Sequence, residues 1–273
     1  MFTFGFSPCP NDTYIFYALT KGLLDTKGFN FDFKIEDVET LNYAVLRGEL
    51  DISKVSCHAY YYVRDKYIFL RKGSAFGRGC GPLIVSKKLT DIKDLSGSKI
   101  AIPGKFTTAF LLLRLFVSEM DLDISKIVVM PYNEIIKSLD GDSVDAGLII
   151  HESRFTYGDY GLNQLIDLGK WWQEDTGLPI PLGGIIAKRT FGEKIIKTVE
   201  DLISESISFA DRNYLSVIPF IKSYAQELSD EVIRAHIDLY VNDYSRNWHV
   251  DCERALERLI NKLKGAKDKW LKF

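Results

Sequence analysis

Residues 1–24, MFTFGFSPCPNDTYIFYALTKGLL, contain the pattern that decides the fold class of this chain. An apolar run over 2–7 leads into a loop rich in proline and polar side chains, and a segment with helical periodicity follows. Asn11, Asp12 or Thr13 can cap that helix, because their side-chain oxygens bind the N–H groups that a first turn leaves unpaired. The stretch therefore predicts a strand, a loop and a helix in succession.

The same alternation of strand and helix continues through the first half of the chain. Residues 28–37 alternate apolar and polar side chains, which predicts a strand with one solvent-exposed face. The remaining expected elements are strands over 51–56, 66–76, 81–88, 98–104, 126–131 and 145–153, and helices over 40–50, 57–65, 107–120 and 133–141. Strands that alternate with helices indicate an α/β fold with mixed, mostly parallel sheets.

The last third changes character after the strand expected over 181–189. Four amphipathic helices are predicted over 194–213, 215–228, 230–244 and 251–267. We expect two domains: a larger one from residues 1–86 and 186–273, and a smaller inserted α/β domain from residues 87–185. In such a fold the ligand is expected in a cleft between the domains, where helices begin after parallel strands.

Composition limits the classes of function. Of the 273 residues, 46% are hydrophobic and 26% are charged, and the formal net charge of −2 argues against a nucleic-acid surface. The start of the chain lacks the regions of a signal peptide, and no apolar run has the length of a membrane span. We therefore expect a cytoplasmic protein with no membrane insertion. The four cysteines lack zinc-binding spacing and are expected to be thiols, so no metal is predicted.

Two polar segments follow strands in the first domain. The loop over 7–13 crowds polar side chains at a helix start, where N–H groups can bind an anion; a rigid turn with a capped helix is the alternative. Lys54, Val55 and Ser56 end the strand over 51–56, at the position where such folds bind ligands. Ser56 can donate to a carboxylate, or it can serve only as the N-cap of the following helix.

A third segment, IPGKFTTA at 102–109, lies between a strand and an apolar helix. Gly104 permits an unusual backbone turn, and Thr107 and Thr108 place two hydroxyls near N–H groups at the helix start. The segment lacks the spacing of glycines and lysine that defines a P-loop. It therefore predicts a seat for a carboxylate or a phosphate, with helix capping alone as the alternative.

An apolar strand delivers His151 at its end, with Glu152 and Arg154 beside it. A histidine at that position can act as a general base near neutral pH, and an adjacent carboxylate can orient its ring. The alternative is a hydrogen-bonded structural histidine. His236 and His249 lie in the C-terminal helices, and we interpret both as structural.

Taken together, these segments resemble the 1,4-dihydroxy-6-naphthoate synthase family, whose members have the two-domain architecture of type II periplasmic binding proteins. The matching stretches span nearly the whole chain in the expected order. They are SPCPNDTYIFYAL (7–19), VETLNYAVLRGELDISKVSCHAY (38–60), GCGPLIVSKK (79–88), IAIPGKFTTAFLLL (100–113), VDAGLIIHESRFTY (144–157) and LPIPLGGIIAKR (178–189). The combination of SPCPNDT with IHESRFTY is the most specific part of the resemblance.

The resemblance implies a carbon–carbon lyase of the futalosine route to menaquinone. Such an enzyme converts cyclic dehypoxanthinylfutalosine into 1,4-dihydroxy-6-naphthoate and dihydroxyacetone, and no cofactor is implied. His151 matches the proton acceptor of the family. The substrate contacts of the family match two groups of residues, namely Lys54, Val55 and Ser56, and Thr107 and Thr108. Asn11 and Arg154 are our further candidates for binding the aromatic carboxylate substrate.

Two alternative functions remain at this point. Chorismate dehydratase, a sister family of the same pathway, shares the architecture, although SPCPNDT and IHESRFTY favour the synthase. A non-catalytic protein that captures a small carboxylate has the same fold, but the expected lack of a signal peptide and of a lipid-anchor cysteine argues against it. The sequence does not fix the oligomeric state.

Overall fold

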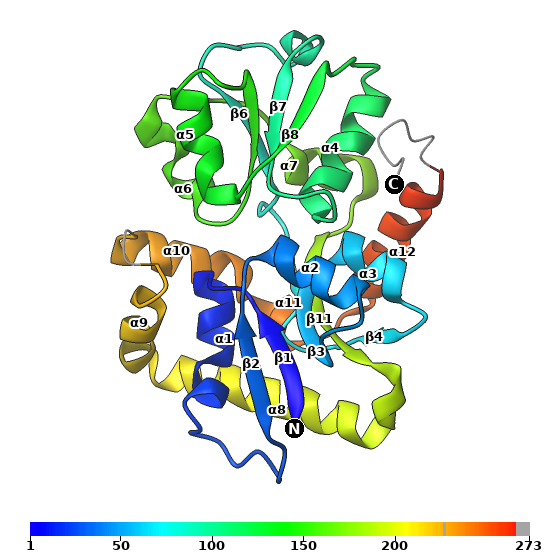
Figure 1. The fold of residues 1–273 in the computed structure, drawn as a ribbon, viewed down its shortest axis with the longest axis vertical. Helices are drawn as coiled ribbons and strands as arrows, with labels where there is room; N and C mark the ends of the chain where they lie inside the picture. The colour runs from blue at the N-terminus through cyan, green and yellow to red at the C-terminus, as the bar shows by residue number, and fades with distance from the viewer. Residues whose placement is uncertain (226–227, 266–273) are drawn as a thin grey trace. The chain divides into compact units, whose positions relative to one another are not determined.

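The computed structural model describes residues 1–225 and 228–265, and its contacts divide the chain into two units (Figure 1). The first unit comprises Met1–Gly77 and Leu182–Cys252. The second comprises Arg78–Pro181 and the segment that begins at Glu253. The chain thus leaves the first unit after Gly77, returns to it at Leu182 after completing a second sheet, and leaves it again after Cys252.

Six strands form the sheet of the first unit, in the order β2–β1–β3–β11–β4, with β5 paired to β11. They are β1 (Phe2–Phe6), β2 (Phe31–Ile35), β3 (Ile52–Ser56), β4 (Tyr67–Phe69), β5 (Ala75–Gly77) and β11 (Ile180–Lys188). β1 runs parallel to β2 and β3, whereas β11 runs antiparallel to β3 and β4. The single strand predicted over 66–76 is wrong, because the chain turns between β4 and β5 at Gly73, where φ is +70°.

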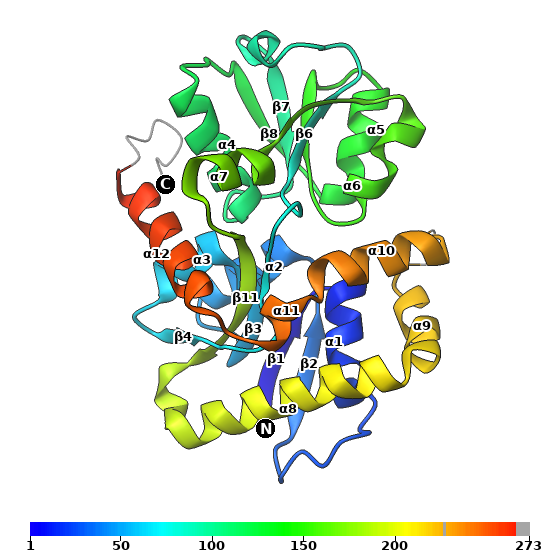
Figure 2. The same ribbon diagram turned by 180° about the vertical axis from the view of Figure 1, so that it is seen from behind.

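Helices cover this sheet, and α8 lies across β1 and β2 in Figure 2. The helices of the unit are α1 (Pro10–Thr20), α2 (Val38–Leu46), α3 (Cys57–Val63), α8 (Gly192–Arg212), α9 (Tyr214–Lys222), α10 (Asp230–Tyr240), α11 (Asp243–Arg246) and the start of α12 (Val250–Gly265). A 3-10 turn over Arg189–Phe191 connects β11 to α8. The helices predicted over 215–228 and 251–267 include residues 226–227 and 266–267, which lie outside the described part of the chain.

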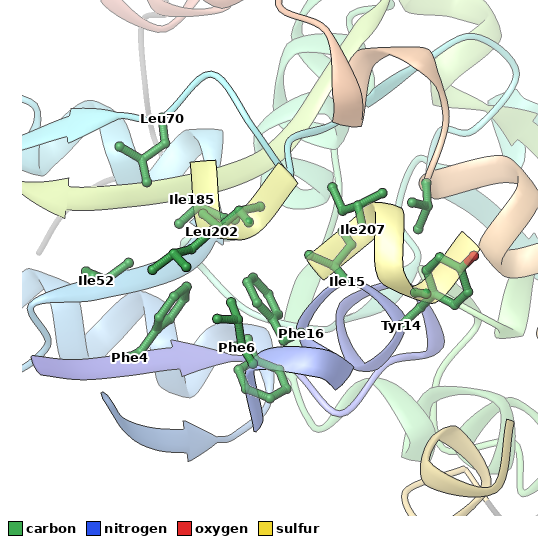
Figure 3. Packing of buried hydrophobic residues seen from close by; sticks show 14 of the residues in the cluster. Phe4, Phe6, Tyr14, Ile15, Phe16, Ile52, Leu70, Ile185, Leu202 and Ile207 are labelled. Atoms are coloured by element: carbon green, nitrogen blue, oxygen red, sulfur yellow. The ribbon is translucent and has the colours of Figure 1, made fainter. Parts of the chain in front are cut away.

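Alternation along β1 directs its two faces to different helices. Phe4 and Phe6 lie in one buried cluster with residues of α1 and α8, among them Phe16 (Figure 3). Gly5 faces α2 on the other side, where an added Cβ would lie 2.7 Å from Cδ2 of Leu41. Burial of each phenylalanine stabilises the unit by about 2–3 kcal/mol. The residues of β1 therefore fix the helices on both faces, and with them the start of α1.

Five strands form the sheet of the second unit, in the order β10–β6–β9–β7–β8. They are β6 (Leu83–Ser86), β7 (Lys99–Ile102), β8 (Lys126–Val129), β9 (Ala146–Ile149) and β10 (Asn163–Asp167). β7 is parallel to β8 and β9, and β6 is antiparallel to β9 and β10. The helices are α4 (Thr108–Glu119), α5 (Ile135–Asp140), α6 (Ser153–Thr156) and α7 (Leu168–Thr176), with 3-10 turns at Ile92–Leu95, Tyr132–Glu134 and Tyr157–Tyr160.

The predicted α/β class with mixed sheets is confirmed. Parallel pairs surround β1 and β7, and antiparallel pairs form around β11 and β6, near two of the places where the chain changes unit. The sequence analysis predicts neither β10 nor α7, because the sequence NQLID has too few alternating apolar residues to mark a strand. Within the described ranges, no helix combines the length and the apolarity that a membrane crossing requires.

The chain changes unit after Gly77, after Pro181 and after Cys252, whereas we expected boundaries at 86/87 and 185/186. The segment from Glu253 onward, which we expected in the first domain, groups with the second unit. Within that unit, Nζ of Lys262 on α12 lies 2.9 Å from a carboxylate oxygen of Asp175 and above the ring of Trp171. These contacts explain why the C-terminal helix belongs to the second unit.

Candidate functional site

Polar side chains gather at the edge where β1 and β3 end in the first unit. Parallel neighbours bring their carboxyl ends to the same edge of a sheet, so Ser7 after β1 and Lys54 and Ser56 of β3 lie at one edge. Successive side chains of a strand point to opposite faces, so Val55 is directed away from Lys54 and is buried. The segment predicted to bind a ligand therefore presents Lys54 and Ser56 as its polar side chains.

α1 begins earlier than predicted, at Pro10, with Cys9 in the N-cap position. Proline suits the first position of a helix because its missing N–H would have no partner there. The predicted caps are wrong, because Asn11 and Asp12 lie inside the first turn and Oγ1 of Thr13 donates to the carbonyl of Cys9. The side chains of the first turn are therefore available for contacts other than capping.

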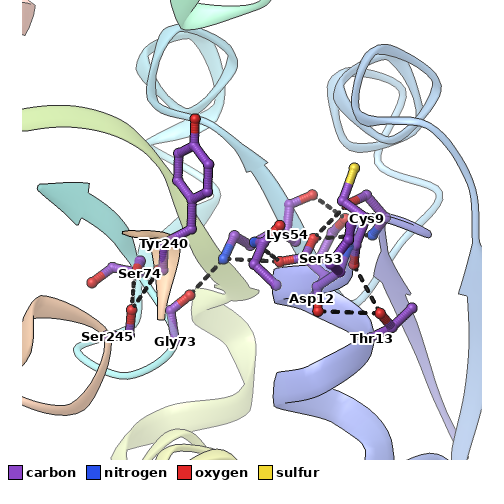
Figure 4. Close-up of polar contacts among 12 residues, drawn as sticks. Cys9, Asp12, Thr13, Ser53, Lys54, Gly73, Ser74, Tyr240 and Ser245 are labelled. Carbon is purple, nitrogen blue, oxygen red and sulfur yellow. Dashed lines mark hydrogen bonds and ion pairs between the residues drawn. The ribbon is translucent and has the colours of Figure 1, made fainter. Parts of the chain in front are cut away.

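Asp12 is the centre of a buried polar cluster (Figure 4). Its Oδ2 accepts from the N–H of Ser7 at 3.1 Å and from the hydroxyl of Ser7 at 2.7 Å. Its Oδ1 accepts from Nδ2 of Asn11 at 2.8 Å and lies 3.2 Å from Nζ of Lys54. Breaking such a buried ion pair by removing one partner typically destabilises a protein by about 3–5 kcal/mol. Lys54 and Asp12 therefore depend on each other for their positions.

A second acceptor fixes the Lys54 ammonium. Nζ donates to the carbonyl of Gly73 at 2.6 Å, in the turn between β4 and β5. The left-handed φ of Gly73 aims this carbonyl, and an added Cβ there would lie 2.5 Å from Cδ1 of Ile185. An ammonium carries three hydrogens, and within the described residues Lys54 has these two acceptors only. Lys54 thus retains one donor for a ligand oxygen.

Ser56 occupies the N-cap position of α3, but its hydroxyl makes no capping hydrogen bond. Instead Nδ2 of Asn42 donates to this hydroxyl at 3.2 Å, and Oδ1 of Asn42 accepts from the N–H of Ser56 at 3.0 Å. Nδ2 of Asn42 also donates to Oε2 of Glu39 at 3.0 Å. Capping alone therefore does not explain Ser56, whose hydroxyl hydrogen can be directed to a ligand.

The second unit has a comparable edge, formed by the ends of β7 and its parallel neighbours β8 and β9. Thr107 after β7 is the N-cap of α4: its Oγ1 accepts from the N–H of Phe110 at 3.2 Å and donates to the carbonyl of Gly104 at 2.9 Å. Thr107 therefore caps α4, and its part in binding a ligand stays a prediction. Thr108 is the first residue of α4, and both threonines are 2% exposed. N–H groups of this first turn can still bind an anion.

His151 lies just beyond β9 and has a φ of +57°, a left-handed conformation that residues other than glycine rarely adopt. Such a conformation costs on the order of 1 kcal/mol and occurs preferentially at functional sites. The ring of Tyr132, which follows β8, meets the His151 ring at 5.0 Å between centroids and 66° between planes. Tyr132 is not among the residues expected at the site, although it follows a strand just as His151 does.

Glu152 and Arg154, the neighbours of His151, have different environments. Oε2 of Glu152 is buried and has no hydrogen-bond partner in the described part of the chain. Arg154 donates to the carbonyl of Gly81 at 2.6 Å and of Gly79 at 3.0 Å, and Nη2 lies 2.7 Å from Oδ2 of Asp167. These contacts tie the segment after His151 to the start of β6 and the end of β10. A role of Arg154 in substrate binding stays a prediction.

Two of the cysteines near these edges, Cys57 and Cys80, are unsuited to act as nucleophiles. All four are buried thiols, as predicted. Burial raises the pKa of Cys57, against a smaller lowering by Lys54, and burial raises the pKa of Cys80 to about 12. Both side chains therefore stay protonated at neutral pH. Among residues 1–225 and 228–265, no cluster of three or more His, Cys, Asp or Glu side chains is arranged to hold a metal ion.

An aromatic cluster in the first unit joins residues far apart in sequence. The ring of Phe69 lies 5.1 Å from Tyr60, 6.0 Å from Phe76 and 5.6 Å from Trp248. Gly184 of β11 makes room for Phe69, since an added Cβ would lie 2.0 Å from the ring. Sequence patterns do not reveal this cluster, because it depends on the pairing of β11 with β4.

Comparison with known proteins identifies relatives along almost the entire chain. A protein-family model described as menaquinone biosynthesis matches residues 2–264. The 1,4-dihydroxy-6-naphthoate synthase of Thermus thermophilus is 46% identical over 94% of this chain and 91% of its own length. The enzyme of the same name from Streptomyces coelicolor is 40% identical over 94% of this chain and 90% of its own length.

Solved structures place the fold. The crystal structure of protein AF1704 from Archaeoglobus fulgidus has a TM-score of 0.90 and 37% identity, and the match covers 97% of both chains. The periplasmic aliphatic sulphonate binding protein of Escherichia coli has a TM-score of 0.69 and 14% identity over 97% of this chain and 86% of its own. The fold is therefore that of the periplasmic binding proteins, and the chain belongs to the menaquinone biosynthesis family that includes the 1,4-dihydroxy-6-naphthoate synthases.

Proposed function

We propose that this protein is a 1,4-dihydroxy-6-naphthoate synthase, a lyase that converts cyclic dehypoxanthinylfutalosine into 1,4-dihydroxy-6-naphthoate and dihydroxyacetone. The observation that carries the proposal is the 46% identity to a synthase of that name over 94% of the chain. A cytoplasmic location suits such a biosynthetic role. The only partner that the proposal requires is the small aromatic carboxylate substrate, with no nucleic acid and no cofactor.

In this proposal, His151 is the general base. Cleavage of a carbon–carbon bond next to a carbonyl needs a base that removes a proton and a donor that stabilises the developing oxyanion. The left-handed backbone at His151 and the edge of the Tyr132 ring give the imidazole a defined direction. The buried carboxylate of Glu152 lies next to it in the chain and would stabilise the protonated ring.

The residues that we propose to bind substrate lie in both units. In the first unit we propose Lys54, through its remaining N–H, together with Ser56 and, less directly, Asn11 and Val55. In the second unit we propose Thr107 and Thr108 at the start of α4, where N–H groups favour a carboxylate, and Arg154. Ammonium, hydroxyl and N–H donors suit a substrate that carries a carboxylate and carbonyl oxygens.

The test is mass-resolved turnover of cyclic dehypoxanthinylfutalosine by the purified protein and by His151→Ala. We expect the wild-type protein to turn the substrate over. In His151→Ala we expect turnover to fall by about 10²–10⁴, the loss typical of removing a general base. His249→Ala, which replaces an exposed histidine elsewhere, is the matched control and is expected to keep its turnover. Production of dihydroxynaphthoate by both variants would move the base to another residue.

A further inference from the structure

The contacts of Lys54 continue into the C-terminal helices of the first unit. Gly73, whose carbonyl accepts from Lys54, donates its own N–H to the carbonyl of Ser245 at 2.8 Å. The hydroxyl of Ser245 lies 2.8 Å from the carbonyl oxygen of Ser74 and 3.0 Å from that of Tyr240, so its one hydrogen is shared between them (Figure 4). The turn that holds Lys54 is therefore fastened to α11 and to the end of α10.

His236, one turn before Tyr240 on α10, returns this network to α1. Nε2 of His236 lies 3.0 Å from Oδ1 of Asn11, and the imidazole is fully buried. The ring of Tyr240 packs against it at 4.7 Å between centroids. The contacts from Asn11 through Asp12 and Lys54 to α10 thus close into a ring.

The direction of the hydrogen bond at His236 follows from its neighbours. Nδ2 of Asn11 donates to Oδ1 of Asp12, and a carboxylate that already receives Lys54 acts only as an acceptor. The oxygen of the Asn11 amide is therefore the atom that faces His236, and Nε2 of His236 is the donor. Asp12 thus sets the orientation of the Asn11 amide, and the N–H of His236 holds the amide oxygen in that orientation.

We infer that His236 is a positioning residue, which sets the Lys54 ammonium for substrate through Asn11 and Asp12. The sequence alone indicates only a structural histidine. This inference rests on the proposed function in one respect, that Lys54 binds the substrate. Without the His236 donor, the Asn11 amide is free to rotate, Asp12 loses one of its four donors, and Lys54 shifts toward Gly73.

Three substitutions separate positioning from packing. His236→Phe keeps a flat ring against Tyr240 but removes the N–H donor. His236→Asn keeps a polar side chain, but that side chain is too short to reach Oδ1 of Asn11. His236→Gln retains an N–H that can meet Asn11. The control is His249→Gln, because His249 is an exposed histidine paired with Asp243 at the surface.

The first readout needs no substrate. In protein labelled with ¹³C-lysine, the Nζ-adjacent methylene resonance of Lys54 is assigned by its disappearance in Lys54→Met. We expect this resonance to move in His236→Phe and His236→Asn, and to stay in place in His236→Gln and His249→Gln. A Lys54 resonance that is unchanged in both His236→Phe and His236→Asn overturns the inference.

The second readout is kinetic. We expect KM for cyclic dehypoxanthinylfutalosine to rise roughly three- to tenfold in His236→Phe, the factor that corresponds to one buried hydrogen bond. kcat is expected to change little, and His236→Gln is expected to restore KM. In a Lys54→Met background, His236→Phe is expected to raise KM no further, because residues of one network are not additive.

The outcomes distinguish the inference from the proposed function. An equal further rise of KM in the Lys54→Met background would show that His236 acts independently of Lys54, and would overturn the inference while the synthase function stands. Absence of turnover in the wild-type protein would refute the proposed function. In that case the Lys54 resonance still decides whether His236 positions the ammonium.

Discussion

At the scale of single residues, Thr107 combines two tasks in one hydroxyl. It caps α4 by accepting from the N–H of Phe110, and it closes the preceding turn by donating to the carbonyl of Gly104. We expect Thr107→Val to lower the free energy of unfolding by about 1 kcal/mol and to raise KM severalfold, since the cap also orders the proposed anion seat. Denaturant unfolding and steady-state kinetics measure the two effects. Thr107→Ser, which keeps the hydroxyl, is the control, and an unchanged KM in the valine variant would leave the threonine a cap only.

The ring of Tyr132 packs against the imidazole of the proposed base at 5.0 Å between centroids. Edge-to-face pairs contribute about 0.5–1.5 kcal/mol beyond burial, so removal of the ring should let the imidazole of His151 rotate. We expect Tyr132→Ala to lower kcat by roughly three- to tenfold, with a smaller change in Tyr132→Phe, which retains the ring. Single-turnover kinetics of both variants test this. An equal loss of kcat in Tyr132→Ala and Tyr132→Phe would show that the contact between the two rings does not orient His151.

At the scale of elements, two glycines let the start of β6 approach α7. A Cβ added to Gly81 would lie 2.2 Å from the Cα of Gly169, which is backbone and cannot move aside alone. Gly81 also presents its carbonyl to Arg154, which ties it to the segment after His151. We expect Gly81→Ala to lower the free energy of unfolding by about 1–3 kcal/mol and to reduce turnover, because the two segments must separate. Gly158→Ala, with open space around the added Cβ, is the control for denaturant unfolding.

Local patterns in the sequence predict much of the element order. The alternation over 28–37 gives β2, and the polar residues after β1, β3, β7 and β9 mark both edges. The start of α1 is misplaced because the polar residues around Asn11 imitate caps, whereas the helix already begins at Pro10. The strand expected over 66–76 divides because Gly73 adopts a left-handed turn, which composition alone does not reveal.

The partners of the site residues could not be predicted, because they come from distant segments whose pairing the sequence does not encode locally. Asn42 meets Ser56 only once α2 packs on β3, and Gly73 meets Lys54 only once the β4–β5 turn folds over the sheet. His236 reaches Asn11 across more than two hundred residues of chain. Local periodicity identifies which residue types are available, while tertiary packing decides which of them touch.

At the scale of the whole molecule, the fold by itself does not select a function. The same architecture serves a sulphonate-binding protein at 14% identity, with a TM-score of 0.69. Similar folds carry unrelated activities because function depends on the residues at the site. In this chain, His151 with its left-handed backbone and the buried Lys54 with an open donor are the residues that we propose for what catalysis requires beyond capture. The choice of substrate is therefore the property that distinguishes the competing functions.

That choice can be measured without chemistry in His151→Ala, which is expected to bind but not to turn over. A ligand that binds only the folded state stabilises it, by about 2.7 kcal/mol at a concentration one hundred times Kd. We expect cyclic dehypoxanthinylfutalosine to raise the thermal unfolding midpoint of this variant by several degrees, and chorismate to leave it unchanged. When Lys54→Met is added to this variant, the rise of the unfolding midpoint with cyclic dehypoxanthinylfutalosine should be smaller, since the proposed donor to the substrate is gone. A larger rise of the midpoint with chorismate would favour a dehydratase. If cyclic dehypoxanthinylfutalosine were recovered unchanged after incubation with the wild-type protein, a binding protein would be favoured, since an enzyme must release product.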